Sequence, residues 1–283
     1  MNHSMINSAA GMRAMQLRID TIANNIANSD TVGYKNQDTA FASLLVRHLD
    51  NQPYAANEPN RLTPLGTRPG FGAKEAILQT DFNQGAIKNT DVPTDLYLEG
   101  EQAFFRIQRT QADGEQAALL TRDGNFKLMP VNGSLQLMTE AGDVVMDNGE
   151  NPRPITLPLN ATQFTVKADG EVLYQVNGKE RRSGQKIGVY SVQNPNILEQ
   201  VGENYYQVPR NMQFNQYAQL SNPRGGQMPQ GMAVHQGGLE MSNVDLRKEM
   251  TSLIEAQRAL QFNARALSYN DQMSDITNRI FRG

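Results

Sequence analysis

The side chains that commonly carry out chemistry in proteins are few in this sequence, and they lie far apart. The three histidines, His3, His48 and His235, do not have the spacing of metal ligands, so each is best explained as a single surface residue. The chain contains no cysteine, which excludes disulfide bonds, thiolate metal sites and a cysteine nucleophile. It also has no nucleophile elbow, phosphate-binding glycine loop, zinc-protease helix motif or calcium-binding loop. The sequence therefore predicts no catalytic residue, no metal site and no cofactor.

Carboxylates come close together in two runs, 95–101 and 138–143. A pair of carboxylates can hydrolyse a glycosidic bond when one of them acts as the acid. Acidic turns at the surface of a β-rich region explain both runs without catalysis, and no part of the chain remains for a separate hydrolase domain. We therefore predict that the protein is not an enzyme.

The composition fits a folded protein of about two compact units, because domains commonly have about 100–200 residues and this chain has 283. Apolar residues make up 39% of the chain and charged residues 19%, which leaves enough apolar material for a core. The formal net charge of −3 gives no electrostatic reason to expect binding of nucleic acid or anionic lipid. No long apolar run predicts a membrane span, and residues 1–20 lack the features of a cleavable secretory signal.

A heptad pattern near the N-terminus predicts a long helix over about residues 4–28. Apolar residues recur there at alternating steps of three and four, as on the contact face of a coiled coil. Ser8 is the one polar member of this series, which consists of Met5, Ser8, Met12, Met15, Ile19, Ile22 and Ile26.

A second heptad pattern follows residue 243 and predicts a longer helix at the other end of the chain. Ser242 and Asp245 have the spacing of a capping box at its start. The predicted contact face contains Leu246, Met250, Leu253, Leu260, Ala264 and Leu267, with Gln257 as a polar insertion. Beyond residue 267 the apolar stripe shifts to Tyr269, Met273, Ile276 and Ile280.

The simplest way to bury both stripes is an antiparallel, coiled-coil-like pair formed by the two ends of the chain. The alternative is that both helices pack on the protein's own sheet. A pair of helices leaves apolar edges uncovered, and these edges would need other subunits, so the pattern favours assembly.

The middle of the sequence predicts antiparallel β structure. Between residues 80 and 205, short apolar runs alternate with six turn dipeptides, at a spacing of about ten residues that fits a sandwich or barrel. The dipeptides are Asp113-Gly114, Asp123-Gly124, Asn132-Gly133, Asn148-Gly149, Asp169-Gly170 and Asn177-Gly178. The predicted strands include 103–109, 117–122, 125–130, 134–139, 164–168, 171–176 and 187–192. Residues 50–75 and 209–237 are rich in Pro, Asn and Gly and are predicted to be loops or extended arms.

These patterns predict a mixed fold: an all-β central region between long terminal helices. We predict three domains. A discontinuous terminal helical domain contains residues 1–35 and 243–283, a connector and inner β domain contains 36–95 and 200–242, and an outer β domain contains 96–199.

Several blocks, in order along nearly the whole chain, resemble the bacterial flagellar axial proteins of the rod and hook. The stretch IANNIANSDTVGYK at residues 22–35 resembles the N-terminal signature of that family. The blocks at 83–108, TRDGNFKL at 121–128, QGGLEMSNVDL at 236–246 and AQRA at 256–259 match further family segments. The long Gly/Pro-rich stretch at 44–73 is more similar to a distal rod subunit than to a hook subunit. Tyr97 and residues 101–103 depart from the family pattern, which leaves a hook or proximal rod paralogue open.

The resemblance implies a structural axial subunit that polymerises into a helical tube, transmits torque and conducts exported proteins. It also implies contacts with neighbouring rod and hook proteins and with the flagellar export apparatus, and a location in the basal body within the cell envelope. No nucleic-acid or small-molecule partner is expected. The alternative from another class is a monomeric β-rich cell-surface binding protein whose terminal helices form its own stalk.

The candidate assembly residues lie in the two helices and in the signature after the first. The apolar candidates are Met12, Met15, Ile19, Ile22, Ile26, Leu246, Met250, Leu253, Leu260 and Leu267. The polar candidates are Asn24, Asn25 and Asn28, whose amides can satisfy backbone groups at a helix end or bridge two chains. They could instead be ordinary exposed residues, with Asn28 as a C-cap. Gly33 is expected to allow a turn that other residues would resist.

Overall fold

The computed structural model describes residues 3–43, 73–110, 116–149, 152–202, 204–209, 218–220 and 231–280. Its contacts divide the chain into two compact units. The first, which we call the helical unit, consists of Met1–Ile26, Gln37–Gln79 and Asp245–Gly283. The second, the β unit, consists of Ala27–Asn36 and Thr80–Val244.

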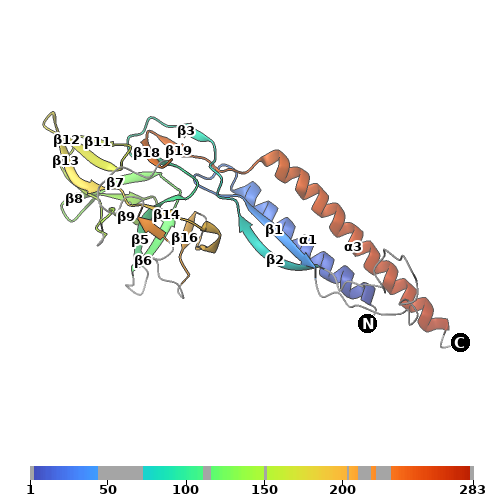
Figure 1. The fold of residues 1–283 in the computed structure, drawn as a ribbon. Coiled ribbons are helices and arrows are strands. Elements are labelled where there is room, and N and C mark those ends of the chain that lie inside the picture. The colour runs from blue at the N-terminus through green and yellow to red at the C-terminus, as the bar shows by residue number, and fades with distance from the viewer. Residues whose placement is uncertain are drawn as a thin grey trace, which may run out of the picture. The chain divides into compact units, whose positions relative to one another are not determined.

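The described part of the helical unit contains two long helices and a two-stranded sheet (Figure 1). Helix α1 spans His3–Ala27 and α3 spans Leu246–Ile280, and the strands are β1 (Gln37–Ser43) and β2 (Ala73–Thr80). In α3, Glu249 lies in the first turn and Arg279 in the last, and both charges complement the helix dipole. Both helices lie where the heptad patterns predicted them.

The start of α3 differs in detail from the predicted capping box. The side chain of Asp245 is the cap, because its Oδ1 accepts hydrogen bonds from the backbone N–H groups of Arg247 (3.0 Å) and Lys248 (3.4 Å). The Ser242 hydroxyl instead accepts from the N–H of Val244 at 3.3 Å. The expected cap at Ser242 was therefore wrong. The cap lies three residues later, because the carboxylate of Asp245 can accept hydrogen bonds from the first N–H groups of α3.

The β unit is built from antiparallel strands, as the turn spacing predicted. Its largest sheet has the order β10-β8-β9-β5-β6-β16-β15, with β14 pairing with β5 and β17, and β7 pairing with β8. The strands of this sheet are β5 (Ala103–Thr110), β6 (Gln116–Thr121), β7 (Phe126–Val131), β8 (Ser134–Thr139), β9 (Val144–Val145), β10 (Thr156–Pro158), β14 (Val189–Val192), β15 (Glu199–Gln200), β16 (Tyr205–Gln207) and β17 (Ala218–Leu220).

Three smaller sheets complete the described part of this unit. A three-stranded sheet contains β11 (Gln163–Val166), β12 (Glu171–Val176) and β13 (Lys179–Lys186). Two ribbons pair β4 (Leu96–Glu99) with β18 (Ala233–Gln236), and β3 (Ile87–Asn89) with β19 (Gly238–Glu240). These ribbons bring residues of the late chain, after 230, against strands that begin the β unit.

The turn dipeptides behave in two ways. Asn132-Gly133 and Asn177-Gly178 have positive φ angles at both residues and close the two-residue hairpins β7–β8 and β12–β13. Asp123-Gly124 was expected to supply such a turn, but neither residue has a positive φ. This prediction was wrong. Glycine is required at position 124 because the backbone of Leu96 passes close by: a Cβ there would lie 1.6 Å from the carbonyl oxygen of Leu96. Asp113-Gly114 lies outside the described residues.

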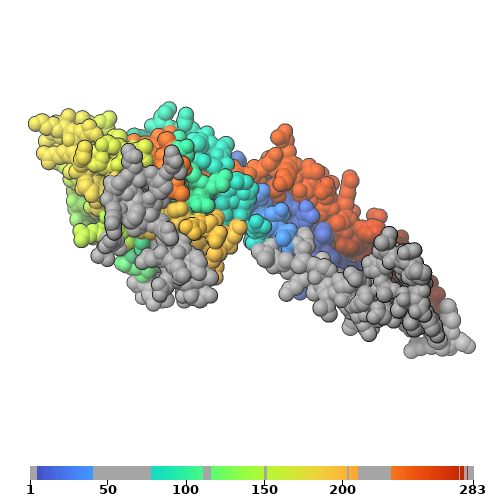
Figure 2. All heavy atoms as spheres, viewed as in Figure 1, coloured from blue at the N-terminus to red at the C-terminus, as the bar shows by residue number. Residues whose placement is uncertain are grey.

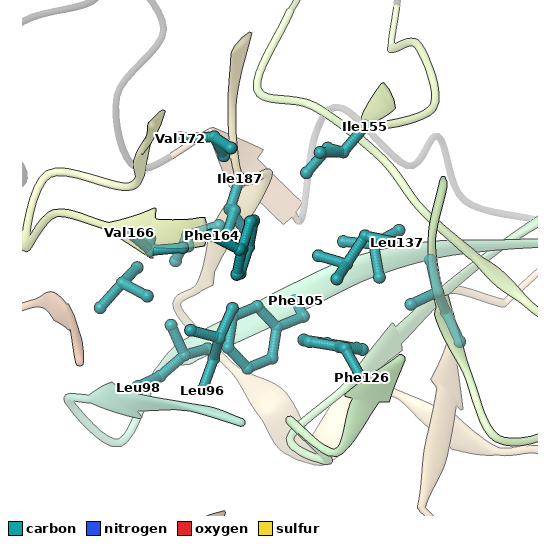
Figure 3. Packing of buried hydrophobic residues seen from close by; sticks show 14 of the residues in the cluster. Leu96, Leu98, Phe105, Phe126, Leu137, Ile155, Phe164, Val166, Val172 and Ile187 are labelled. Atoms are coloured by element: carbon teal, nitrogen blue, oxygen red, sulfur yellow. The ribbon is translucent and has the colours of Figure 1, made fainter. Parts of the chain in front are cut away.

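Two apolar clusters fill the β unit. The larger cluster gathers side chains from most of the sheets, and Phe105, Phe126 and Phe164 are among its aromatic members (Figure 3). The smaller cluster contains Phe104, Tyr190 and Tyr206 with four further residues. Strand β5 separates the two, because successive side chains of a strand point to opposite faces, which sends Phe104 into one cluster and Phe105 into the other.

The predicted fold class is confirmed: a central antiparallel β region lies between two terminal helices in the sequence. The division into three domains stays a prediction. Residues 44–72, 210–217 and 221–230 lie outside the described residues. The prediction of loops or extended arms at 50–75 and 209–237 was wrong where strands form, because β2 begins at residue 73 and β17 and β18 lie within 209–237. Neither helix combines the length and the apolar composition of a membrane span, as far as the described chain goes.

Candidate functional site

The two helices of the helical unit pack antiparallel to each other. The side chain of Asn25 in α1 donates a hydrogen bond of 3.4 Å to Glu249 of α3, and Gly11 of α1 lies under the amide of Asn263. From the first contact to the second, the chain runs backwards along α1 and forwards along α3 by the same number of residues, as it does in an antiparallel pair. The terminal pair predicted from the heptads is therefore present within one compact unit.

The centre of this helix pair is small and polar, and the predicted apolar residues flank it. On α3 the central positions are spaced seven apart: Glu249, Ala256, Asn263 and Asn270 are buried or half-buried. On α1 the most deeply buried residues are Ala14, Thr21, Ile22 and Asn25. Small side chains at the centre let the helices approach closely, which moves the larger Met and Ile side chains to the edges of the contact.

The predicted contact residues accordingly fall into three groups. Ile22 is buried. Half-buried positions on the flanks hold Met12, Met15, Ile19, Ile26, Leu253, Leu260 and Leu267. Leu246 and Met250 are exposed, at 41% and 51%. The role of all these residues in assembly stays a prediction.

Large apolar side chains are exposed along much of the length of α3. Seven large side chains on this helix are between 41% and 72% exposed: Leu246, Met250, Ile254, Phe262, Tyr269, Met273 and Ile276. Phe262, Tyr269 and Ile276 are spaced seven apart and so lie in one stripe, roughly 100° around the helix from the line of Ala256 and Asn263. In Figure 2 the orange and red surface of α3 lies open along one side of the helical unit.

The three asparagines at the end of α1 have three different environments. Asn25 is 1% exposed, and its amide bonds both to the N–H and to the carbonyl of Gln37, at 3.1 and 2.8 Å. It therefore fixes the start of β1 to the last turn of α1. Asn28 caps the helix end, where its Oδ1 accepts from the Thr31 hydroxyl at 3.1 Å and its carbonyl accepts from the Thr31 N–H. Asn24 is exposed.

Gly33 occupies a position that no other residue fits. Its φ is +69°, and a Cβ there would lie 2.6 Å from the backbone nitrogen of Asp123 and 2.8 Å from the carbonyl carbon of Arg122. Its N–H donates to the carbonyl of Glu240 at 2.8 Å. The expected turn at Gly33 is confirmed, and the close approach of two other chain segments is an additional reason for glycine.

Directly after Gly33, a buried cluster of three charges ties distant parts of the sequence together. The carboxylate of Glu240 accepts a hydrogen bond from Lys35 Nζ at 2.7 Å and another from Arg122 Nη1 at 3.2 Å. All three side chains are at most 1% exposed. The N–H of Gly85 donates to the same carboxylate at 3.0 Å, so Glu240 is the common acceptor of the cluster.

Each of the two cations also donates a hydrogen bond to one backbone carbonyl. Lys35 donates to the carbonyl of Asn83 at 2.7 Å, and Arg122 donates to the carbonyl of Gly100 at 2.6 Å. The guanidinium of Arg122 also lies over the ring of Phe104, 5.1 Å from its centre. Burial lowers the pKa of both cations, and the negative charge of Glu240 opposes this effect.

Asp123, next to Arg122, is the carboxyl group with the most perturbed proton affinity of those described. Burial is the main cause that raises its pKa from 3.8 to about 6, and the charges of Glu140 and Asp95 add to the shift. Its Oδ1 accepts from the N–H of Asn125 at 2.9 Å, so the group holds the turn that follows Arg122.

The acidic runs that could have formed a catalytic pair are engaged in ordinary structural contacts. Asp143 forms a two-point ion pair with Arg109, and Glu140 pairs with Lys127. Glu99 lies 2.9 Å from His235, whose ring stacks on Tyr97. Among the described residues, no group of three or more His, Asp or Glu side chains is arranged to hold a metal ion.

Comparison with known proteins gives three matching family models. "Flagella basal body rod protein" matches residues 5–35, "Flagellar hook protein FlgE/F/G D1 domain" matches 98–174, and "Flagellar basal body rod FlgEFG protein C-terminal" matches 235–280. The chain is 32% identical to the flagellar basal-body rod protein FlgG of Borreliella burgdorferi over all of both chains. The chain belongs to the family of flagellar rod and hook proteins.

Two further relatives support this placement along the full length. FlgG of Caulobacter vibrioides is 33% identical over 274 residues, which cover 96% of this chain and 97% of the relative. The flagellar hook-basal body complex protein FlhP of Bacillus subtilis is 31% identical over 99% of this chain and all of the relative. The resemblance read from the sequence blocks is thereby confirmed, and the monomeric surface protein is not favoured.

Each family match contributes one charge to the buried cluster. Lys35 is the last residue of the N-terminal match, Arg122 lies in the D1 match and Glu240 in the C-terminal match. The sequence blocks that carried the resemblance therefore contain the cluster, although the sequence reasoning did not single out these three residues. No local signal distinguishes them, because the same blocks contain other charges, such as Asp123 and Lys127 in TRDGNFKL.

Proposed function

We propose that this protein is a structural, non-enzymatic subunit of the flagellar rod, most similar in role to the distal rod protein, and that it polymerises into a helical tube. Membership of the rod and hook family supports a structural axial role, and the similarity to several full-length rod proteins supports the rod. In this proposal the tube transmits torque and conducts exported proteins. Its partners are further copies of this chain, adjacent rod and hook proteins, and the flagellar export apparatus.

The observation that carries the self-assembly proposal is the set of exposed apolar side chains on α3, above all the stripe of Phe262, Tyr269 and Ile276. In a monomer these exposed apolar side chains remain in water and contribute no free energy of burial. Burying a Leu, Ile, Phe or Met side chain fully is worth roughly 1.5–3 kcal/mol, so contacts between copies would recover a substantial free energy. The stripe of Phe262, Tyr269 and Ile276 has the heptad spacing that a neighbouring helix needs for regular packing.

The test compares two substitutions on the same helix in the full-length chain. Phe262→Asp places a charge in the exposed stripe, whereas Gln261→Asp places the same charge at the next position, which is already polar and exposed. We expect Phe262→Asp to abolish incorporation into basal bodies and to leave the free energy of unfolding of the monomer almost unchanged, because Phe262 is 72% exposed. Gln261→Asp should still be incorporated.

Incorporation is measured by mass spectrometry on purified basal bodies from cells that express each variant in place of the natural chain. Polymerisation of the purified chain is followed by sedimentation. Normal incorporation of Phe262→Asp would contradict the proposed role of this face. Loss of both variants would show that the helix tolerates no added charge and would remove the specific argument for the stripe.

A further inference from the structure

The exposed side of α1 carries a second heptad pattern, made mainly of small and polar side chains. Between residues 5 and 26, every exposed side chain of α1 except Asn24 follows alternating steps of three and four. This set, which we call the α1 outer seam, consists of Ile6, Ala9, Arg13, Gln16, Asp20 and Ala23. It lies roughly 100–160° around the helix from the line of the buried residues Ala14 and Thr21, so it is open to a neighbouring molecule.

The exposed side of α3 carries a pattern of the opposite kind, made of large and cationic side chains. Between the apolar residues of the stripe on this helix, exposed Arg or Gln side chains continue alternating steps of four and three. This set, which we call the α3 outer seam, consists of Arg258, Phe262, Arg265, Tyr269, Gln272 and Ile276. A surface that covers this seam must leave room for three large side chains and offer a negative charge to an arginine.

The α1 outer seam of one copy matches the α3 outer seam of a second copy in one antiparallel register. Equal steps backwards along α1 and forwards along α3 then place Asp20 opposite Arg265 and Arg13 opposite Gln272. A shift by one heptad in either direction places Arg13 opposite Arg265 or opposite Arg279, where the α3 series continues. Like charges opposite each other are unfavourable, so the charges select the first register.

The register selected by the charges also matches the side chains by size. It places Ala23 opposite Phe262 and Ala9 opposite Ile276, so each of these large apolar side chains meets a small residue. A large side chain that fills the space over a small one is the basis of knobs-into-holes packing between helices. Phe262 and Ile276 are 72% and 58% exposed in the monomer, so the contact removes apolar surface from water.

We propose that the α1 outer seam of one copy is the docking surface for the α3 outer seam of a second copy, in the register that pairs Asp20 with Arg265. This inference rests on the proposed function as a self-assembling subunit, and it identifies the surface that receives the exposed stripe of α3. Each copy offers both seams, so it binds one neighbour through α1 and another through α3. Such a head-to-tail contact builds an open helical polymer when its rotation does not close a ring.

The test exchanges the two charges in the full-length chain, which is expressed in place of the natural chain. Asp20→Arg and Arg265→Asp are made separately and then together. Each single exchange brings like charges opposite each other, whereas the double exchange restores an opposite pair. The control is Asp20→Arg combined with Arg258→Asp, which introduces the same charges one heptad out of register. Both Asp20 and Arg265 are exposed, so the monomers should keep their helix content by circular dichroism.

Incorporation into purified basal bodies is measured by mass spectrometry. We expect each single exchange to lower incorporation on the order of tenfold or more, because like charges across an interface are strongly unfavourable. The in-register double exchange should return incorporation to within about twofold of the parent chain, and the out-of-register control should stay low. Normal incorporation of the single exchanges would overturn the proposal. Rescue by neither double exchange, or equal rescue by both, would also overturn it.

A second measurement does not depend on these charges and decides the matter if a charge variant loses its helices. The chain has no cysteine, so Arg13→Cys with Gln272→Cys introduces the only two thiols, at positions that the register places opposite each other. Oxidation of assembled material should link many copies into covalent chains on a denaturing gel. The control is Arg13→Cys with Arg279→Cys, which lies about 10 Å out of register and should give mainly monomers.

The two ways of failing are distinguishable. Assembled material that stays monomeric on the gel with the in-register cysteine pair would overturn this pairing and leave the proposed self-assembly intact. Absence of the parent chain itself from basal bodies would instead contradict the proposed function.

Discussion

Replacing Glu240 by Gln should destabilise the β unit far more than a single exposed ion pair can. The substitution keeps the shape of the side chain but leaves two cations, Lys35 and Arg122, without their negative partner. Their side chains are fully buried, so water cannot replace the lost interaction. Breaking a buried ion pair by removing one partner costs about 3–5 kcal/mol in general, and the two cations here place Glu240→Gln in that range.

The control is Glu140→Gln, which removes the carboxylate of another Lys–Glu pair with almost the same separation. The Lys127–Glu140 distance is 2.8 Å and the Lys35–Glu240 distance is 2.7 Å. The difference is exposure: the side chains are 47% and 75% exposed in the first pair, against 0% and 1% in the second. We expect no measurable loss of stability for Glu140→Gln, because exposed pairs are screened by water.

The assay is urea unfolding of the full-length chain, followed by tyrosine fluorescence. The chain has no tryptophan, and seven of its nine tyrosines, including the buried Tyr34, Tyr190 and Tyr206, belong to the β unit, so the tyrosine signal reports mainly on this unit. With a urea dependence of about 2 kcal/mol per M, the midpoint for Glu240→Gln should fall by about 1.5–2.5 M. Adding Lys35→Met should recover part of the loss, because one unpaired buried charge is removed. A midpoint shift no larger than that of Glu140→Gln would refute the reasoning.

Two further predictions concern the neighbours of this cluster. The pKa of Asp123 is raised in the folded protein, so this group favours folding at low pH, and that contribution is lost as the pH rises from about 4 to above 6. Asp123→Asn should therefore raise the free energy of unfolding at pH 8 by about 3 kcal/mol, since one pKa unit corresponds to about 1.4 kcal/mol, and should give almost no gain at pH 4, as measured by urea unfolding at both values. A gain that is equal at both pH values would contradict the assigned cause. Gly33→Ala should lower the melting temperature of the β unit, since the added Cβ meets backbone atoms of Arg122 and Asp123 within 3 Å at a positive φ, and strain of this kind costs about 1–3 kcal/mol. An unchanged melting temperature would show that the backbone there relaxes freely.

The sequence predicted the elements well because their signals are local. Heptad spacing located α1 and α3, and the Asn-Gly dipeptides located the β7–β8 and β12–β13 hairpins. The residues at the centre of the helix contact were harder to predict from the sequence. Their size and apolar character predicted that Met12 and Met15 lie at the centre of the contact. In the structure α1 and α3 instead approach each other at Gly11, Ala14 and polar residues.

The ion cluster could not be derived from the sequence, because its partners are far apart along the chain. Lys35 and Glu240 are separated by 205 positions, and Arg122 and Glu240 by 118. A lysine or arginine is usually exposed, and nothing local distinguishes these two from the other cations of the chain. Only the folded arrangement of β3, β19 and the turn after β6 brings the three together.

The most direct test of the structural role is mass spectrometry on purified hook–basal bodies from cells that carry this chain, before and after the hook is removed by acid. The account predicts that the chain is present in an amount comparable to other axial subunits and remains with the rod after acid treatment. Absence of the chain from bodies that contain the other rod proteins in quantity would contradict the axial role.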